Sequence, residues 1–208
     1  ADPDLFARVA VGRWVMKYGS VAFHDPFAFT FTKPLWIDHE WLSGVIFHLL
    51  SCFGGDGTLF VASVIVAFFS MCLLSMASKL NSGRRINLAV FLLVLVDISV
   101  VWGSTIRSQV FTYLFIPLIL YLIVRHRTLN RTRLFIFIPF LIAIWANLHG
   151  GFVVGVGFLT IYAITHLVQR SKSSLLVLGV AIFSILSTLI NPYGFHYWVY
   201  MYEALLHA

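Results

Sequence analysis

The chain has 208 residues, of which 60% are hydrophobic and only 11% carry a formal charge. A soluble domain carries charges on about 25% of its residues, so this composition excludes an ordinary soluble globular domain. The net charge of +6 does not indicate a nucleic-acid partner. Most of the basic residues fall in loops beside apolar segments, where they set orientation in a membrane and meet anionic lipid.

The first 57 residues differ from the rest in being polar and aromatic. Residues 5–18 have the apolar spacing of an amphipathic helix, and Asp4 is placed to cap it. Residues 24–34 contain two prolines and alternate Phe with Thr, which predicts an ordered surface loop. An apolar helix is predicted over residues 42–53, before Gly54-Gly55. Because this helix is too short to cross a bilayer, we expect it to be juxtamembrane or re-entrant.

Six long apolar runs follow, and all but the run at 134–147 are close to the length that crosses a bilayer core of about 30 Å. The runs lie at about 58–78, 86–103, 109–124, 134–147, 151–168 and 174–190. We therefore predict an all-α fold, a polytopic transmembrane helix bundle of about six spans over residues 58–190. Residues 1–57 are predicted to form an extracytoplasmic loop with juxtamembrane helices. Residues 191–208 are predicted to form an outer turn and the start of a further helix.

The loops between these runs alternate between basic and nearly uncharged sequences. The basic loops, which contain no Asp or Glu, are residues 79–85, 125–133 and 169–173. The positive-inside rule assigns these loops to the cytoplasm. The remaining segments then share the outer face: residues 1–57, 104–108, 147–151 and 191–198. Because the run at 134–147 is short, the turn after it either lies at membrane depth or closes a tight hairpin between two tilted helices.

Carboxylates in the first outer segment are the candidate catalytic groups, namely Asp2, Asp4, Asp38 and Glu40. Paired carboxylates can act as a general base or bind Mg²⁺ or Mn²⁺ through oxygen, so Asp2 and Asp4 are also candidate metal ligands. Helix capping and solubility are the alternative explanation of this Asp-Pro-Asp pattern. Cys52 and Cys72 lack CxxC spacing, and we expect neither a disulfide nor a metal site from them.

The outer turns carry the candidate phosphate ligands, namely Arg107, Asn147, His149, Asn191 and Tyr193. A guanidinium offers a planar fork to phosphate oxygens, and an imidazole adds a tunable donor. Taken singly, each residue is also explained as an interfacial or helix-capping group. Asp97 lies inside the apolar run at 86–103. An ionisable group there faces a cavity or a partner such as Arg107 or His149, or else makes a buried hydrogen bond.

Six short motifs occur in order along the chain. They are Asp-Pro-Asp-Leu with Gly-Arg-Trp at 2–14, His-Asp-Pro-Phe at 24–27, Trp-Ile-Asp-His-Glu-Trp-Leu at 36–42, Arg-Ser-Gln-Val-Phe-Thr-Tyr at 107–113, Trp-Ala-Asn-Leu-His-Gly-Gly at 145–151 and Leu-Ile-Asn-Pro-Tyr-Gly at 189–194. Together these motifs resemble bacterial multispan membrane proteins of the GT-C glycosyltransferase type. The resemblance implies an enzyme of the bacterial cytoplasmic membrane that transfers a sugar from a polyprenyl-phosphate-linked donor.

The resemblance also implies roles for the candidate residues. Asp2 or Asp4 would be the catalytic base in the first outer loop. Asp38 or Glu40 would support that base or a divalent cation. Arg107 and His149 would contact the donor phosphate.

Two departures from the family pattern concern the ends of the chain. The first transmembrane helix of the family is absent before Ala1, and its C-terminal helices are absent after Ala208. A start without Met fits a processed or truncated chain, so we expect a fragment or a shortened relative. Two other classes remain open. A non-catalytic subunit of a larger membrane complex, with protein partners, would need only apolar outer faces. A transporter would use Asp97, Arg107 and His149 as a substrate or proton path.

Overall fold

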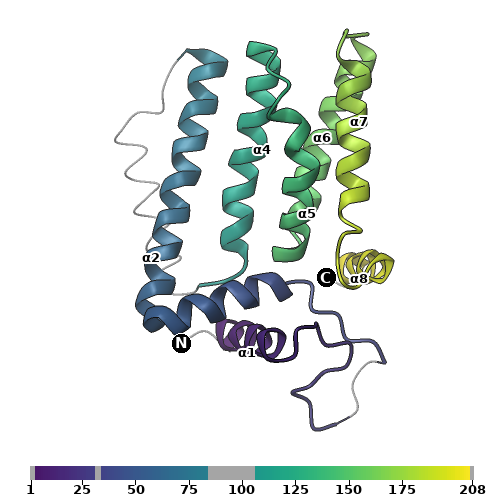
Figure 1. Cartoon of the computed structure of the whole chain (residues 1–208). Coiled ribbons are helices and arrows are strands. Elements are labelled where there is room, and N and C mark those ends of the chain that lie inside the picture. The colour runs from purple at the N-terminus through teal and green to yellow at the C-terminus, as the bar shows by residue number, and fades with distance from the viewer. Residues whose placement is uncertain (1–2, 31–33, 84–105, 207–208) are drawn as a thin grey trace.

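The computed structural model describes residues 3–30, 34–83 and 106–206, and every regular element in these ranges is helical (Figure 1). In chain order the helices are α1 (Pro3–Tyr18), α2 (Trp41–Ser82), α4 (Gln109–Leu129), the short 3-10 helix η1 (Phe135–Phe137), α5 (Ile138–Leu148), α6 (Phe152–Val168), α7 (Ser174–Ser187) and α8 (Phe195–Leu206). The prediction of an all-α fold is confirmed for the described ranges.

The apolar runs predicted from the sequence coincide with helices to within a few residues, apart from the run at 86–103, which lies outside the described residues. Helices α2 and α4 are long and apolar enough to cross a membrane. The helical stretch from η1 through α5 is apolar but shorter, as are α6 and α7. Length and composition therefore support two spans in the described part of the chain, and the predicted total of about six is not confirmed.

Helix α2 changes direction at Gly54 and Gly55, where the backbone dihedrals leave the helical region. Gly55 has φ 61° and ψ −146°, a conformation that is essentially restricted to glycine. The part of α2 before this break lies across one end of the bundle, together with α1 and α8 (Figure 1). The part after the break runs alongside α4. The helix predicted before Gly54-Gly55 is thus observed, and its location at a membrane surface stays a prediction.

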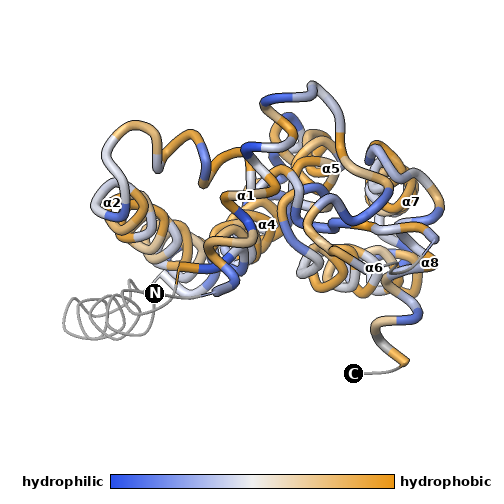
Figure 2. Tube along the Cα trace, turned by 90° about the horizontal axis from the view of Figure 1, so that it is seen from below, coloured by the Kyte–Doolittle hydropathy of each residue, from blue (hydrophilic) through white to orange (hydrophobic). Residues whose placement is uncertain are grey.

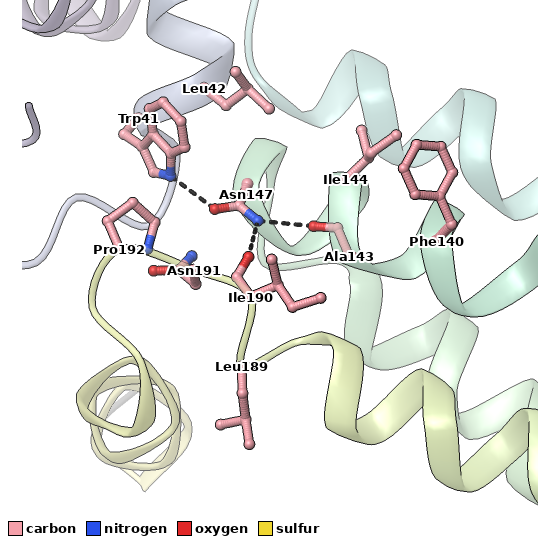
Figure 3. Close-up of a pocket in the computed structure, with 10 residues that line it drawn as sticks. All are labelled: Trp41, Leu42, Phe140, Ala143, Ile144, Asn147, Leu189, Ile190, Asn191 and Pro192. Carbon is pink, nitrogen blue, oxygen red and sulfur yellow. Dashed lines mark hydrogen bonds between the residues drawn. The ribbon is translucent and has the colours of Figure 1, made fainter. Parts of the chain in front are cut away.

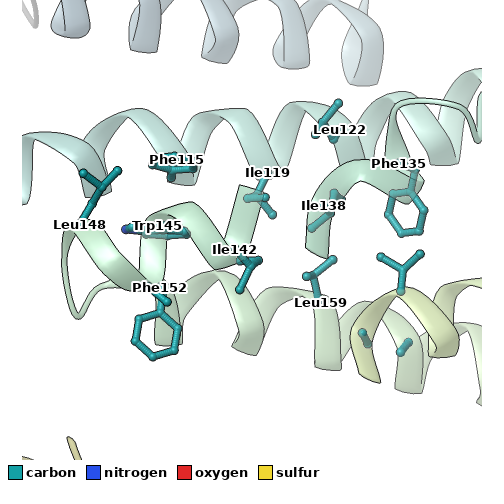
Figure 4. Packing of buried hydrophobic residues seen from close by; sticks show 14 of the residues in the cluster. Phe115, Ile119, Leu122, Phe135, Ile138, Ile142, Trp145, Leu148, Phe152 and Leu159 are labelled. Atoms are coloured by element: carbon teal, nitrogen blue, oxygen red, sulfur yellow. The ribbon is translucent and has the colours of Figure 1, made fainter. Parts of the chain in front are cut away.

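Helices α4, α5, α6 and α7 share the main hydrophobic core (Figure 4). Phe115 of α4 stacks on Trp145 of α5, with ring centroids 5.4 Å apart. Gly155 allows α6 to approach this pair, because a Cβ there would lie only 2.5 Å from Cζ3 of Trp145. This packing fixes the turn between α5 and α6, which carries His149, at the end of the bundle that α1 crosses.

The helices of the bundle are rich in apolar residues, as the hydropathy colouring illustrates (Figure 2). Large apolar side chains exposed on their outer faces include Phe140, Ile161, Val168 and Phe183. Soluble monomers rarely expose apolar surface on this scale, so the faces are suited to contact with lipid or with another protein.

Helix α1 crosses the first part of α2 at a pair of glycines. A Cβ on Gly12 would lie 2.0 Å from the carbonyl oxygen of Gly44, and a Cβ on Gly44 would lie 2.6 Å from the carbonyl oxygen of Arg8. The two backbones can approach this closely only because both side chains are hydrogen atoms. The predicted helix over 5–18 is confirmed, but Asp4 lies inside its first turn and does not precede the helix as a cap.

Candidate functional site

Four segments meet at the end of the bundle that α1 crosses: α1 itself, the residues before α2, the residues before α4, and the α5–α6 turn. Asp4 and Arg8 are four residues apart on α1 and therefore lie on the same side of the helix. Glu40 immediately precedes α2, and Arg107 precedes α4 by two residues. Residues that are distant in the sequence are thus brought to one place.

A polar pocket of about 160 Å³ lies between these segments. It is lined by Asp4, Arg8, Glu40, Arg107, Ser108 and Gln109. Nη1 of Arg107 lies 3.5 Å from Oδ2 of Asp4, and both side chains are well exposed. A 2.8 Å hydrogen bond between the hydroxyls of Ser43 and Ser108 ties α2 to the start of α4. The pocket therefore presents two guanidinium groups and two carboxylates to solvent at the end of an apolar bundle.

Asp38 is buried next to this pocket and does not line it. Its Oδ1 accepts hydrogen bonds from the guanidinium of Arg8 and, at 3.0 Å, from the backbone N–H of Glu40. Its own backbone N–H donates to the hydroxyl of Tyr193 at 3.2 Å, and that hydroxyl donates to the carbonyl of Ala22 at 3.2 Å. Burial raises the pKa of Tyr193 to about 12. Asp38 and Tyr193 therefore hold the first loop against the turn before α8.

The carboxylate of Glu40 also meets two imidazoles. Its Oε1 lies 3.5 Å from Nε2 of His149 and 3.6 Å from Nε2 of His39. Burial lowers the pKa of both histidines, although the charge of Glu40 acts in the opposite direction. Tyr197 of α8 is buried nearby, and burial, followed by the charge of Glu40, raises its pKa. Glu40 thus stands between the polar pocket and a cluster of titratable rings.

Asn147 connects α2, α5 and the segment after α7 through its side-chain amide (Figure 3). Its Oδ1 accepts from Nε1 of Trp41 at 2.9 Å, and its Nδ2 donates to the carbonyls of Ala143 and Ile190, each at 2.8 Å. These side chains border an apolar pocket of about 610 Å³ whose other lining residues include Leu42, Phe140, Ile144, Leu189 and Pro192. Asn191 also borders this pocket, and its Oδ1 accepts from the backbone N–H of Tyr193 at 2.9 Å.

The structure brings together Asp4, Glu40 and Arg107 in the polar pocket, with His149 on the far side of Glu40. The other candidates at the outer turns, Asn147, Asn191 and Tyr193, make hydrogen bonds within the fold and do not line that pocket. Asp2 and Asp97 lie outside the described residues. Within the described ranges, no group of three or more His, Cys, Asp or Glu side chains is arranged to hold a metal ion.

Three residues of the site were not singled out from the sequence: Arg8, His39 and Thr112. The four-residue spacing between Asp4 and Arg8 was a usable signal, because it places both on one helix face. Sequence gave no comparable signal for His39, which flanks Glu40, or for Thr112, whose hydroxyl lies 2.7 Å from Nδ1 of His149. The contact of Thr112 depends on how α4 packs against the α5–α6 turn.

No family model, curated protein or solved structure matches the chain. The resemblance to GT-C glycosyltransferases therefore rests on the six sequence motifs.

Proposed function

We propose that this chain is a membrane glycosyltransferase, or part of one, that takes a sugar from a polyprenyl-phosphate-linked donor at the outer face of the bacterial cytoplasmic membrane. The observation that carries the proposal is the polar pocket, in which Arg107 lies beside Asp4 and Glu40 at the end of an apolar helix bundle. The motif resemblance supports the same class of reaction. The multispan topology and the outward orientation are parts of this proposal.

The residues of the pocket are suited both to activating the acceptor hydroxyl and to stabilising the leaving phosphate. A carboxylate, Asp4 or Glu40, accepts the proton of the acceptor hydroxyl as that oxygen forms a bond to the sugar carbon. The bond between the sugar and the donor phosphate breaks, and the phosphate leaves with the bonding electrons. Arg107 stabilises the departing charge through its guanidinium, and the N-terminus of α4 adds a partial positive charge at the same place.

The apolar pocket beside Trp41 suits the lipid part of such a donor. Trp41 follows Glu40 directly and borders this pocket of about 610 Å³. The walls are almost entirely hydrocarbon, and the amide of Asn147 is engaged in hydrogen bonds to other segments. A hydrocarbon chain can therefore lie against the bundle while its phosphate remains at the membrane surface, which spares the cost of extracting the chain from the bilayer.

A test of the base uses Asp4→Asn and Glu40→Gln, singly and combined, in the full-length protein reconstituted with polyprenyl-phosphate hexose donors. Loss of the base is expected to reduce sugar transfer by about 10²-fold or more, because general bases contribute 10²–10⁴. Asp56→Asn, which alters an exposed acid directly after the kink of α2 and outside the lining of the polar pocket, is the matched control and should transfer normally. Wild-type transfer by the combined variant would refute the assignment of the base to this pocket.

A test of the phosphate site uses Arg107→Ala and measures binding of a polyprenyl monophosphate in lipid nanodiscs. The expected loss of affinity is about 10- to 100-fold, because a charge-assisted contact contributes about 1.5–3 kcal/mol. Arg133→Ala, at the start of the next helical hairpin, is the charge-matched control. A non-catalytic subunit would bind the lipid phosphate equally well with and without Arg107, and that result would exclude the proposed site.

A further inference from the structure

We infer that His149 is held as a neutral imidazole with its proton on Nε2, and that it is a positioning residue for the carboxylate of Glu40 and not a cationic phosphate ligand. The protonation state of the His149 ring is inferred from the hydrogen bonds of the ring alone. Only the role of Glu40 rests on the function proposed above.

The Nδ1 side of the ring faces two donors. The backbone N–H of Gly151 donates to Nδ1 at 3.0 Å. Because a backbone N–H can only donate, Nδ1 must offer its lone pair and cannot carry a proton. The hydroxyl of Thr112 lies 2.7 Å from the same nitrogen.

The direction of the Thr112 contact follows from the absence of a proton on Nδ1. Nε1 of Trp145 lies 3.1 Å from Oγ1 of Thr112, and an indole N–H can only donate. The Thr112 oxygen therefore accepts from Trp145. Because Nδ1 of His149 carries no proton, the hydroxyl of Thr112 donates its own proton to Nδ1. The chain of donors runs from Trp145 through Thr112 to His149.

The packing around Nδ1 requires glycine at position 151. A Cβ at position 151 would lie 2.3 Å from Oγ1 of Thr112 and 2.9 Å from Nδ1 of His149. Only glycine lets the backbone N–H approach the ring beside the threonine hydroxyl. Thr112, His149 and Gly151 therefore act as one packed unit.

The other ring nitrogen faces Glu40. A neutral imidazole with a lone pair on Nδ1 has its proton on Nε2, which lies 3.5 Å from Oε1 of Glu40. Protonation of the ring would put an N–H at Nδ1 directly against the N–H of Gly151. The pKa of His149 is lowered by burial and by His39, whereas the charge of Glu40 raises it, so the surroundings as a whole favour the neutral ring.

This arrangement has a consequence for Glu40. A neutral donor orients the carboxylate without cancelling its charge, whereas an imidazolium would form an ion pair and make the carboxylate a weaker base. The other carboxylate oxygen, Oε2, lies 3.7 Å from Nη1 of Arg8 on the pocket side. The carboxylate of Glu40 therefore faces the neutral ring of His149 through one oxygen and the guanidinium of Arg8, at the polar pocket, through the other.

The ring state is tested by ¹⁵N NMR of the full chain labelled at histidine nitrogens in nanodiscs, without any substrate. The His149 resonances, assigned by their loss in His149→Gln, are expected to show an Nε2–H tautomer at pH 7. Thr112→Val should raise the pKa of His149, because it removes a donor to the Nδ1 lone pair, while Thr160→Val on the exposed face of α6 should not. An imidazolium at pH 7, or an Nδ1–H tautomer, overturns the inference.

The positioning role is tested by two conservative variants in the transfer assay. His149→Gln keeps an amide donor that reaches Glu40, whereas the shorter side chain in His149→Asn places its amide near the Nδ1 position and its donor out of reach of Glu40. We expect His149→Gln to transfer sugar within about threefold of wild type and with the same pH profile. His149→Asn should lose at least tenfold in turnover with donor binding unchanged. Equal loss in both variants overturns the positioning role. Absence of transfer in the wild-type protein refutes the proposed function but leaves the NMR result standing.

Discussion

Asp38 and Glu40 are two residues apart, yet their environments differ. The side chain of Asp38 is 1% exposed and that of Glu40 is 17% exposed, and both lie near the guanidinium of Arg8. The carboxylate of Asp38 accepts hydrogen bonds from Arg8 and from the backbone of the turn before α2. Glu40, in contrast, lines the polar pocket. Of these two candidate catalytic carboxylates, the geometry favours Glu40 for chemistry and Asp38 for structure.

The structural role of Asp38 predicts a loss of stability in Asp38→Asn. Removal of one member of a buried ion pair costs about 3–5 kcal/mol, and the partial exposure of Arg8 places the expected value near the lower figure. The measurement is the thermal unfolding midpoint in detergent, followed by tryptophan fluorescence. Asp56→Asn removes an exposed carboxylate and should leave that midpoint unchanged. Equal midpoints for wild type and Asp38→Asn would show that the pair contributes little.

The sequence could identify polar residues on one face but not their partners. Charge sidedness is a local property of loops, so Asp4, Glu40, Arg107 and His149 could be grouped in advance. The contact between Arg8 and Asp38 spans thirty positions and depends on how α1 docks against the loop before α2. No local pattern encodes such a contact.

At the scale of elements, helix bounds followed from apolar patterning, whereas helix crossings did not. The run predicted at 151–168 is observed as Phe152–Val168, and the predicted break at Gly54-Gly55 is the kink of α2. Gly12 and Gly44 are both interior to helices, where glycine is unfavourable by about 1 kcal/mol relative to alanine. The structure explains these glycines, because a Cβ at either position would clash with backbone atoms where α1 crosses α2.

The glycine crossing predicts that Gly12→Ala displaces α1. The added Cβ would lie 2.0 Å from a backbone oxygen that cannot rotate away, so the helices must separate. Overpacking of this kind costs about 1–3 kcal/mol. Hydrogen exchange of the α1 amides should accelerate in this variant. Gly179→Ala on α7, where a Cβ meets nothing within 4 Å, is the matched control and should exchange as wild type does. Unchanged α1 protection in Gly12→Ala would contradict the observed crossing.

At the scale of the whole molecule, the two kinds of loop lie at opposite ends of the bundle. The C-terminal ends of α2 and α4 lie at one end, together with the connection from α6 to α7 (Figure 1). The segment before α2, the polar pocket and α8 lie at the other. The alternation of basic and uncharged loops in the sequence is therefore matched by a physical separation in the structure. The separation does not depend on how many of the apolar helices cross the membrane.

The separation predicts which end meets the outside of the cell. In a protein whose Cys52 and Cys72 are replaced by serine, Thr30→Cys should react with a membrane-impermeant maleimide in intact cells. Thr128→Cys should react only after the membrane is permeabilised, because it adjoins the basic residues that the positive-inside rule holds in the cytoplasm. Both variants replace an exposed threonine by cysteine, so the comparison does not confuse burial within the protein with protection by the membrane. The reverse labelling pattern would place the pocket of Asp4, Glu40 and Arg107 in the cytoplasm. A donor presented at the outer surface could not reach it there, and the proposed function would fail together with the orientation.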